Sequence, residues 1–169
     1  MINLDNDDLD FFINDKRYKF VIKTLVDYFP ELSHIDPEEI VTVSNIKVDN
    51  RNKKAKTVFA DITKISDKLF AVNKEYFIGN KPYKYILQIY ENHVENFTDE
   101  QLIVVIYHEL LHISEEGNLR SHDFEDFYGV IDKVKNTRWA NDGAQIESIL
   151  DDDKTKEIQE HLANTKDQI

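Results

Sequence analysis

The chain has 169 residues, of which 41% are hydrophobic and 32% are charged, and its formal net charge is −12. This length favours one domain with a substantial hydrophobic core. The lack of cysteine excludes disulfides and thiolate metal sites. No stretch approaches the ~18 consecutive apolar residues of a membrane span. With an acidic N-terminus and no basic-then-apolar leader, the chain is expected to be cytoplasmic, without a membrane partner.

The first part of the chain predicts one helix. Residues 1–14 carry four aspartates and no basic residue, and we expect an acidic N-terminal lead-in there. Apolar residues at close to helical spacing then predict a helix from Asp15 to about Tyr28, which Pro30 ends.

Three strands are expected next, because apolar and β-branched residues alternate over residues 40–48, 56–65 and 83–90. The polar segment 49–54 is expected to be a hairpin loop between the first two. Residues 66–82 fit no single pattern.

A second helix is predicted to start at Thr98, because Gln101 follows at the spacing of a capping box. The run from 102 to 107 is continuously apolar, so this helix should be central and buried. Gly117 is its expected stop.

Two more helices are predicted, one from about 124 to 136 and one from 144 to about 163. Residues 151–169 are very polar and are expected to be a C-terminal helical tail. Strands followed by helices indicate an α+β fold. We expect a small, mostly antiparallel three-stranded sheet packed on the buried second helix, with flanking helices.

That buried helix contains the pattern H-E-x-x-H. Residues four apart share one face of a helix, so His108 and His112 can direct two imidazoles at one Zn²⁺ ion. Glu109 is rotated by about 100° and can take a proton from zinc-bound water. The alternative is a core helix whose polar groups are satisfied within the protein.

A catalytic zinc needs a third protein ligand. His122 is the favoured residue, since the nine residues after His112 are enough for a hairpin return to the metal. Asp123 and Asp126 are close enough to be the ligand instead, or to orient a histidine ring as hydrogen-bond acceptors. In the remaining alternative, Ser121 or Asp123 caps the next helix and His122 is a solvated neighbour.

At these residues the sequence resembles the putative phage metallopeptidases, small zincin-like proteins of phages and prophages. Two metal motifs carry most of the resemblance, with weaker support from two strands and a tryptophan: 108–113, 122–127, 56–60, 85–89 and Trp139.

The resemblance implies a zincin-like metallopeptidase domain over residues 15–150, a zinc cofactor, and a peptide or protein substrate in a bacterial host cell. In zincin-like folds, a strand before the metal helix lines the cleft and pairs with extended peptide. The resemblance assigns this role to the edge of residues 83–90, and the alternative is that these residues form an interior strand with no free edge.

Charge is unevenly distributed along the chain. Residues 16–85 hold 14 basic and 9 acidic residues, whereas residues 91–132 hold 1 basic and 11 acidic residues. An acidic field attracts metal cations and basic peptides and opposes the nucleic-acid backbone, so no nucleic-acid partner is expected. Solvated surface charge that maintains solubility is the simpler explanation.

Two functions are compatible with the sequence. The first is a zinc hydrolase, a phage or prophage metallopeptidase that cleaves peptide bonds with zinc-bound water and Glu109 as general base. Tyr128 and Tyr107 are candidates to stabilise the oxyanion. The second is a non-catalytic phage-encoded inhibitor of a host protein, with a structural metal and an acidic binding surface. Zinc suits the nitrogen ligands, although Co²⁺, Mn²⁺ or Ni²⁺ could occupy them.

Overall fold

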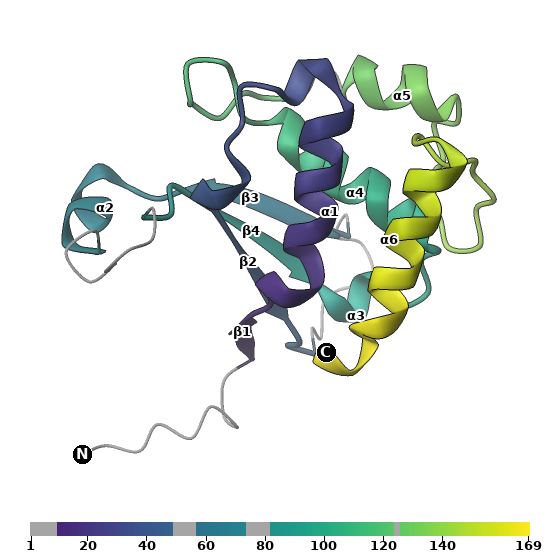
Figure 1. The fold of residues 1–169 in the computed structure, drawn as a ribbon, viewed down its shortest axis with the longest axis horizontal. Helices are drawn as coiled ribbons and strands as arrows, with labels where there is room; N and C mark the ends of the chain where they lie inside the picture. The colour runs from purple at the N-terminus through teal and green to yellow at the C-terminus, as the bar shows by residue number, and fades with distance from the viewer. Residues whose placement is uncertain (1–9, 49–56, 74–81, 124–125) are drawn as a thin grey trace.

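The computed structural model describes residues 10–48, 57–73, 82–123 and 126–169. These parts form an α+β fold with one four-stranded sheet. Helices pack on one face of the sheet, as Figure 1 shows.

The sheet contains β1 (Phe11–Ile13), β2 (Ile40–Asn45), β3 (Ala60–Lys64) and β4 (Tyr85–Tyr90) in the order β1-β2-β4-β3. β1 is antiparallel to β2 and β3 is antiparallel to β4, but β2 and β4 are parallel. The expected three-stranded sheet is therefore wrong. A fourth strand comes from the segment expected to be a lead-in, and the sheet is mixed.

β4 lies between β2 and β3, so those two consecutive strands are not neighbours. The segment 49–54, expected to be a hairpin loop, lies outside the described residues. β4 suits an interior position because its inward side chains Tyr85, Leu87 and Ile89 are at most 5% exposed. Since β4 is hydrogen-bonded on both sides, the expectation that residues 83–90 form the free edge is wrong. That edge belongs to β3.

The α-helices agree with the sequence predictions to different degrees. α1 has the predicted bounds, whereas the helices expected over 124–136 and 144–163 begin later in the structure. α2 lies in the segment that fitted no pattern, and α3 was not predicted. The helices are α1 (Asp15–Tyr28), α2 (Asp67–Asn73), α3 (Glu91–Val94), α4 (Asp99–Leu111), α5 (Tyr128–Val134) and α6 (Asp152–Asn164). Short 3-10 turns cover Pro30–Leu32, Pro37–Glu39 and Lys166–Gln168.

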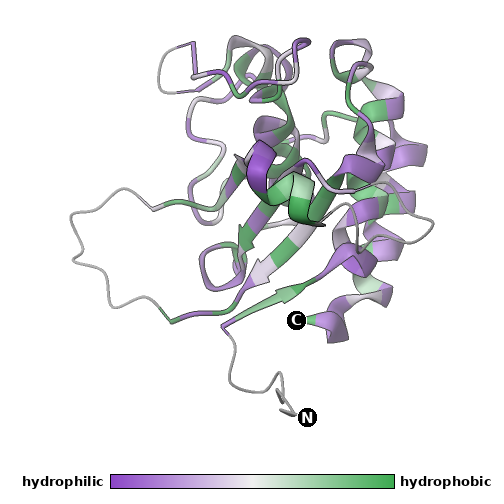
Figure 2. Ribbon diagram, turned by 90° about the vertical axis from the view of Figure 1, so that its left-hand side faces the viewer, coloured by the Kyte–Doolittle hydropathy of each residue, from purple (hydrophilic) through white to green (hydrophobic). Residues whose placement is uncertain are grey.

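α4 is the central helix. Its start has the predicted capping box: Thr98 accepts from the Gln101 amide, and the Gln101 side chain accepts from the Thr98 amide. Residues 102–107 are all buried, which explains their unbroken apolar run. Figure 2 shows hydrophobic residues gathered in the strands and on the inward sides of the helices.

The two ends of the described chain meet at α1 and α6, which lie side by side in Figure 1. Ile158 and Leu162 of α6 are at most 2% exposed. Arg17 of α1 donates through Nη1 to the Leu162 carbonyl at 2.8 Å. No helix in the described parts is both long and apolar enough to span a membrane.

A buried polar network joins α1, β2 and α3. The Tyr18 hydroxyl donates to both carboxylate oxygens of Glu91 at 2.7 and 2.9 Å, and the Ser44 hydroxyl donates to one of them. Asn14 donates to Ser44. Burial raises the pKa of Glu91, although the bonds from Ser44 and Tyr18 and the charge of Arg17 act in the opposite direction.

Candidate metal and catalytic site

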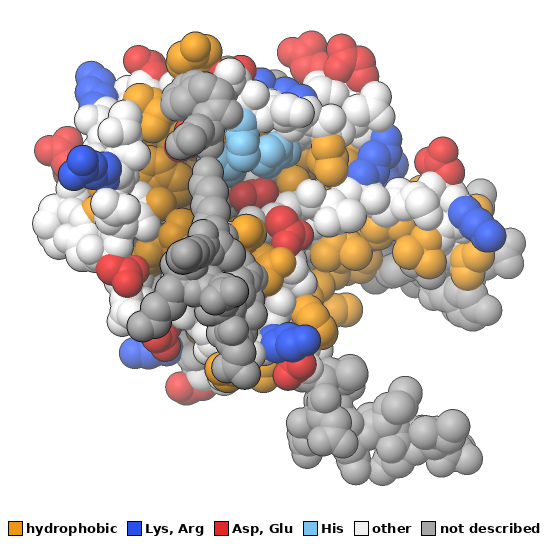
Figure 3. All heavy atoms as spheres, turned by 180° about the vertical axis from the view of Figure 1, so that it is seen from behind, with side chains coloured by type: hydrophobic (Ala, Val, Ile, Leu, Met, Phe, Trp, Pro, Cys, Tyr) orange, Lys and Arg blue, Asp and Glu red, His pale blue; other side chains and the backbone are white. Residues whose placement is uncertain are grey.

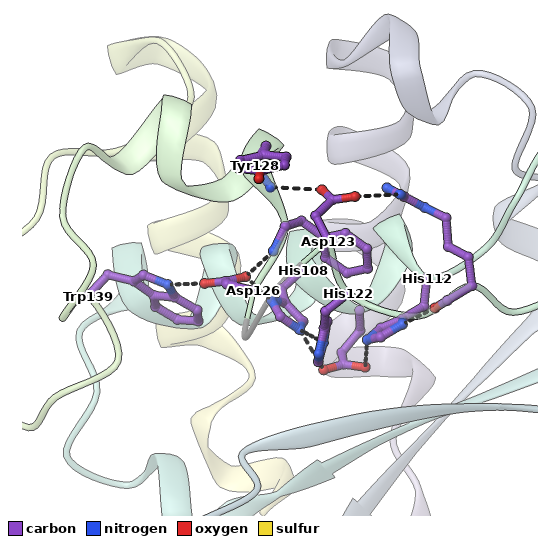
Figure 4. Close-up of polar contacts among 10 residues, drawn as sticks. His108, His112, His122, Asp123, Asp126, Tyr128 and Trp139 are labelled. Carbon is purple, nitrogen blue, oxygen red and sulfur yellow. Dashed lines mark hydrogen bonds and ion pairs between the residues drawn. The ribbon is translucent and has the colours of Figure 1, made fainter.

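Three histidines converge beside the C-terminal end of α4. His108 lies in its last turn and His112 is its C-cap residue, so the two rings are one turn apart. One ring nitrogen from each of His108, His112 and His122 lies within 4.8 Å of the others. The Nε2 atoms of His108 and His122 are 2.9 Å apart. Figure 4 shows the two rings directed toward each other.

His122 reaches the other two histidines through a tight hairpin. Ile113 and Leu119 form an antiparallel bridge. Gly117 in the turn has a φ of 75°, a left-handed conformation that favours glycine. The Tyr85 hydroxyl donates to the Gly117 carbonyl at 2.8 Å and so attaches the turn to β4.

Hydrogen bonds fix two of the imidazoles. His108 donates through Nδ1 to Asp126 at 2.7 Å, and His112 donates through Nδ1 to the Arg120 carbonyl at 2.7 Å. These acceptors require the hydrogen to be on Nδ1, so each neutral ring presents the lone pair of Nε2 to the cluster. The Trp139 indole donates to the second Asp126 oxygen at 2.9 Å, which holds the carboxylate in place.

The electrostatics suit these roles. Burial raises the pKa of Asp126, but hydrogen bonds from His108, Trp139 and the Phe127 amide outweigh it and leave the pKa lowered. Asp126 is thus held as an ionised acceptor. Burial lowers the pKa of His112, which favours the neutral imidazole that binds metals.

The other candidates from the sequence lie farther from the cluster. Asp123 accepts from the Tyr128 amide at 3.0 Å and lies 3.7 Å from Arg120. The Tyr128 side chain is 68% exposed and is not part of the cleft lining, and in Figure 4 it lies beyond Asp123 from the histidines. Tyr107 is fully buried and donates to Glu31 at 2.7 Å. An oxyanion role for Tyr128 or Tyr107 stays a prediction.

Phe127 supports the histidines from within the core. It is fully buried, and its ring centroid lies 5.2, 4.8 and 5.1 Å from the rings of His108, His112 and His122. The Arg120 guanidinium lies 4.4 Å from the same centroid. One aromatic ring therefore limits the tilt of all three imidazoles.

Glu109 is turned toward the same point. It is 7% exposed, and its two carboxylate oxygens lie 4.0 Å from His108 Nε2 and 3.9 Å from His112 Nε2. Burial, followed by the charge of Asp61, raises the pKa of Glu109 to about 8, while a hydrogen bond from the Ile62 amide acts against that rise. A divalent cation at the imidazole nitrogens would lower this pKa again.

The Ile62 amide is available because β3 is an edge strand. Phe59 and Tyr90 are hydrogen-bonded across the β3–β4 pair, and so are Ile65 and Lys84. Odd-numbered residues of β3 therefore bond to β4, and even-numbered residues such as Ile62 direct their backbone groups outward.

A cleft of about 770 Å³ runs between α4 and β3. In Figure 3 the histidines reach the surface between apolar side chains, with acidic side chains next to them. The surface of the cleft is mostly apolar, and three of the lining residues are acidic. The lining residues are Thr57, Val58, Phe59, Ala60, Asp61, Ile62, Val105, His108, Glu109, His112, His122, Asp126, Ile131, Thr137, Trp139 and Ala140.

Several of these contributions were not identified from the sequence. The Arg120 carbonyl and the Ile62 amide are backbone groups, and the residue types at these positions do not indicate what the backbone contacts. Phe127 belongs to the motif at 122–127, but nothing in the sequence indicated that its ring would contact all three imidazoles. Asp61 follows the strand alternation, but nothing local indicated that its strand is at the edge.

The comparisons with known proteins agree with this geometry. A family model described as putative phage metallopeptidase matches residues 10–152. No curated protein and no solved structure matched the chain. The matched segment includes the four strands, the three clustered histidines, Glu109 and Trp139. With most of its length matched, the chain belongs to the putative phage metallopeptidase family.

Proposed function

We propose that the protein is a zinc-dependent metallopeptidase of zincin type that cleaves a peptide bond in the cleft between α4 and β3. The observation that carries the proposal is the combination of three convergent imidazole nitrogens with a buried carboxylate facing two of them. The family gives independent support for a metal-dependent peptidase.

The donor set fits a zinc ion. His108, His112 and His122 would hold it through nitrogen, and three protein ligands leave a fourth position open, as catalytic zinc sites require. A divalent metal held there supplies Lewis-acid chemistry and lowers the pKa of a water molecule. Nitrogen ligands alone do not distinguish zinc from Co²⁺, Mn²⁺ or Ni²⁺.

Glu109 would transfer the proton. Its carboxylate oxygens face the same space as the Nε2 atoms, which suits a general base that takes a proton from the attacking water and returns it to the leaving amine. The Ile62 amide orients this carboxylate through a hydrogen bond.

Within the described residues, the outer side of β3 has no neighbouring strand, and this edge suits an extended peptide. The outward backbone groups of Ala60 and the outward carbonyl of Ile62 line the cleft beside the histidines, and a peptide could add to them as a further strand while the Ile62 amide stays bonded to Glu109. In this proposal the substrate pairs with β3, whereas the sequence favoured the strand at residues 83–90.

The inhibitor hypothesis would be favoured by a closed site with four protein ligands. Within the described residues, Asp123 and Asp126 are held by other partners and lie outside the cluster of ligand atoms. The geometry therefore favours the hydrolase.

The test compares Glu109→Gln with His122→Ala. Glu109→Gln keeps the shape of the side chain but cannot accept the proton, so it should bind a full equivalent of zinc and lose peptide hydrolysis by at least about 100-fold. His122→Ala removes a ligand and should lower zinc affinity by several orders of magnitude. Elemental analysis, zinc competition and mass spectrometry of digested peptide mixtures measure these effects.

Wild-type hydrolysis rates in Glu109→Gln would refute the mechanism. Full zinc retention in His122→Ala would show that His122 is not a ligand.

A further inference from the structure

One carboxylate in the cleft has no assigned role. Of the three acidic residues in the lining, Glu109 faces the histidine nitrogens, and Asp126 uses both oxygens in hydrogen bonds. Asp61 accepts through Oδ2 alone, from Gln88 at 3.1 Å and from the Tyr90 hydroxyl at 2.8 Å. Among the described residues, its Oδ1 has no hydrogen bond and its charge has no ion-pair partner.

These two donors give Asp61 a fixed orientation. Gln88 and Tyr90 project from β4 on the sheet face that α4 does not cover, next to Asp61 on the edge strand. Because both bonds reach the same oxygen, the carboxylate is positioned while its other oxygen stays available. Asp61 directly precedes Ile62, whose amide donates a hydrogen bond to Glu109, so Asp61 lies on the part of β3 that lines the cleft with the histidines.

We propose that Asp61 selects substrates with a lysine or arginine side chain next to the bond that is cleaved. This inference rests on the proposed peptidase function. No lysine or arginine among the described residues lines the cleft, so a substrate cation would be the countercharge of Asp61.

Strand geometry places the basic residue. In a peptide added to the β3 edge, the residue opposite Asp61 projects to the same sheet face as Asp61. Its two neighbours project to the other face, toward the apolar wall of Val105, Ile131, Trp139 and Ala140. The preferred substrate is therefore a basic residue flanked by apolar residues in an extended segment.

The experiment uses matched peptides and matched variants. Peptides that the zinc-loaded protein cleaves are first found in a randomised mixture by mass spectrometry. Each is then resynthesised with lysine, methionine or glutamate at the position next to the cleaved bond. Methionine matches the length of the lysine stem without its charge. These peptides are compared on the wild type, on Asp61→Asn, and on Asp67→Asn, which removes the same charge at an exposed position of α2.

The wild type and Asp67→Asn should prefer lysine over methionine about fivefold in kcat/KM, the size expected of a partly exposed ion pair. Asp61→Asn should reduce this ratio to about one, and added salt should reduce it in the wild type. Any effect of Asp61 on the Glu109 pKa is shared by both peptides and cancels in the ratio.

Binding separates this inference from the proposed function. The binding measurement uses two fluorescein-labelled peptides of fixed design, with lysine or methionine between apolar residues, so it does not depend on cleavage. Their dissociation constants for zinc-loaded Glu109→Gln, with and without Asp61→Asn, should show the same ratios. If the wild type cleaves no peptide, the proposed function fails, and this binding ratio still decides the role of Asp61. A lysine-to-methionine ratio near one, a ratio that Asp61→Asn leaves unchanged, or no peptide binding would each overturn the inference.

Discussion

At the scale of single residues, the site depends on groups that never touch the proposed metal. Asp126 connects His108 to Trp139, and the Trp139 carbonyl in turn accepts from Gln101 at the start of α4. The ring that would bind the ion is thus fixed through a chain of hydrogen bonds that returns to its own helix. Such outer partners orient the ligand and increase its basicity.

We predict that Asp126→Asn lowers zinc affinity by about 10- to 100-fold. His108 and Trp139 donate to different oxygens of Asp126, so in asparagine one of these donors would face the amide NH2 group, and the negative charge is also lost. Trp139→Phe is the matched control, since it removes one donor and leaves the Asp126–His108 pair, and it should have a smaller effect. Zinc competition with a chromophoric chelator at fixed pH gives both values. Equal affinity in Asp126→Asn and the wild type would contradict this role.

At the scale of elements, the hairpin after α4 and the edge strand β3 determine what the histidines can do. The hairpin returns the chain through a left-handed glycine and brings His122 to the other two rings. β3 supplies the amide that holds Glu109. The third proposed ligand and the proposed base therefore depend on two elements outside α4, the hairpin for His122 and β3 for Glu109.

Two glycines provide a controlled test of the hairpin. Gly117 and Gly143 have φ values of 75° and 73°, so alanine at either position should cost roughly 1–2 kcal/mol of stability. A Cβ at Gly117 would lie 3.3 Å from the Tyr85 hydroxyl, whereas a Cβ at Gly143 would have no described atom outside its neighbouring residues within 4 Å. Gly117→Ala should therefore also lower zinc affinity by displacing His122, while Gly143→Ala should not. Urea unfolding and zinc titration check this, and equal zinc affinities would argue against the hairpin's role.

The sequence predicted local features better than pairings. α1, the capping box of Thr98 and three of the four strands depend on short-range patterns, and all are present. The strand order could not be read, because β2 and β3 lack a local signal that β4 separates them. For the same reason, the edge role was assigned to the wrong strand. The fixed spacing of His108, Glu109 and His112 predicted the candidate site. The backbone groups and Asp61 could not be predicted as part of it, because only the tertiary fold brings them there.

At the scale of the whole molecule, a buried acid lies away from the cleft. Glu91 is 5% exposed and links α3 to Tyr18 of α1 and Ser44 of β2. Its hydrogen bonds compensate only part of the cost of burying its charge, so its pKa is raised. The core therefore contains a group whose ionisation weakens the fold.

The free energy of unfolding should therefore depend on the ionisation of Glu91. Because the pKa of Glu91 is higher in the folded state than its ordinary value of 4.5, the folded state binds the proton more tightly. The associated stability is fully present below pH 4.5 and is lost as pH rises through the raised pKa. The wild type should thus lose stability relative to Glu91→Gln as the pH rises above 4.5, as measured by urea unfolding at constant zinc. The exposed Glu95→Gln should follow the wild type, and parallel curves for Glu91→Gln would refute the assignment.

The strand order also constrains how the protein is made. During synthesis β2 and β3 leave the ribosome before the strand that separates them, so neither can complete its sheet position until residue 90 has emerged. Sheets with such non-local pairings form slowly, and their exposed strand edges can associate with other chains. The histidines follow β4 in the chain, so the strand that secures β3, and with it the amide for Glu109, is made before any of the proposed ligands.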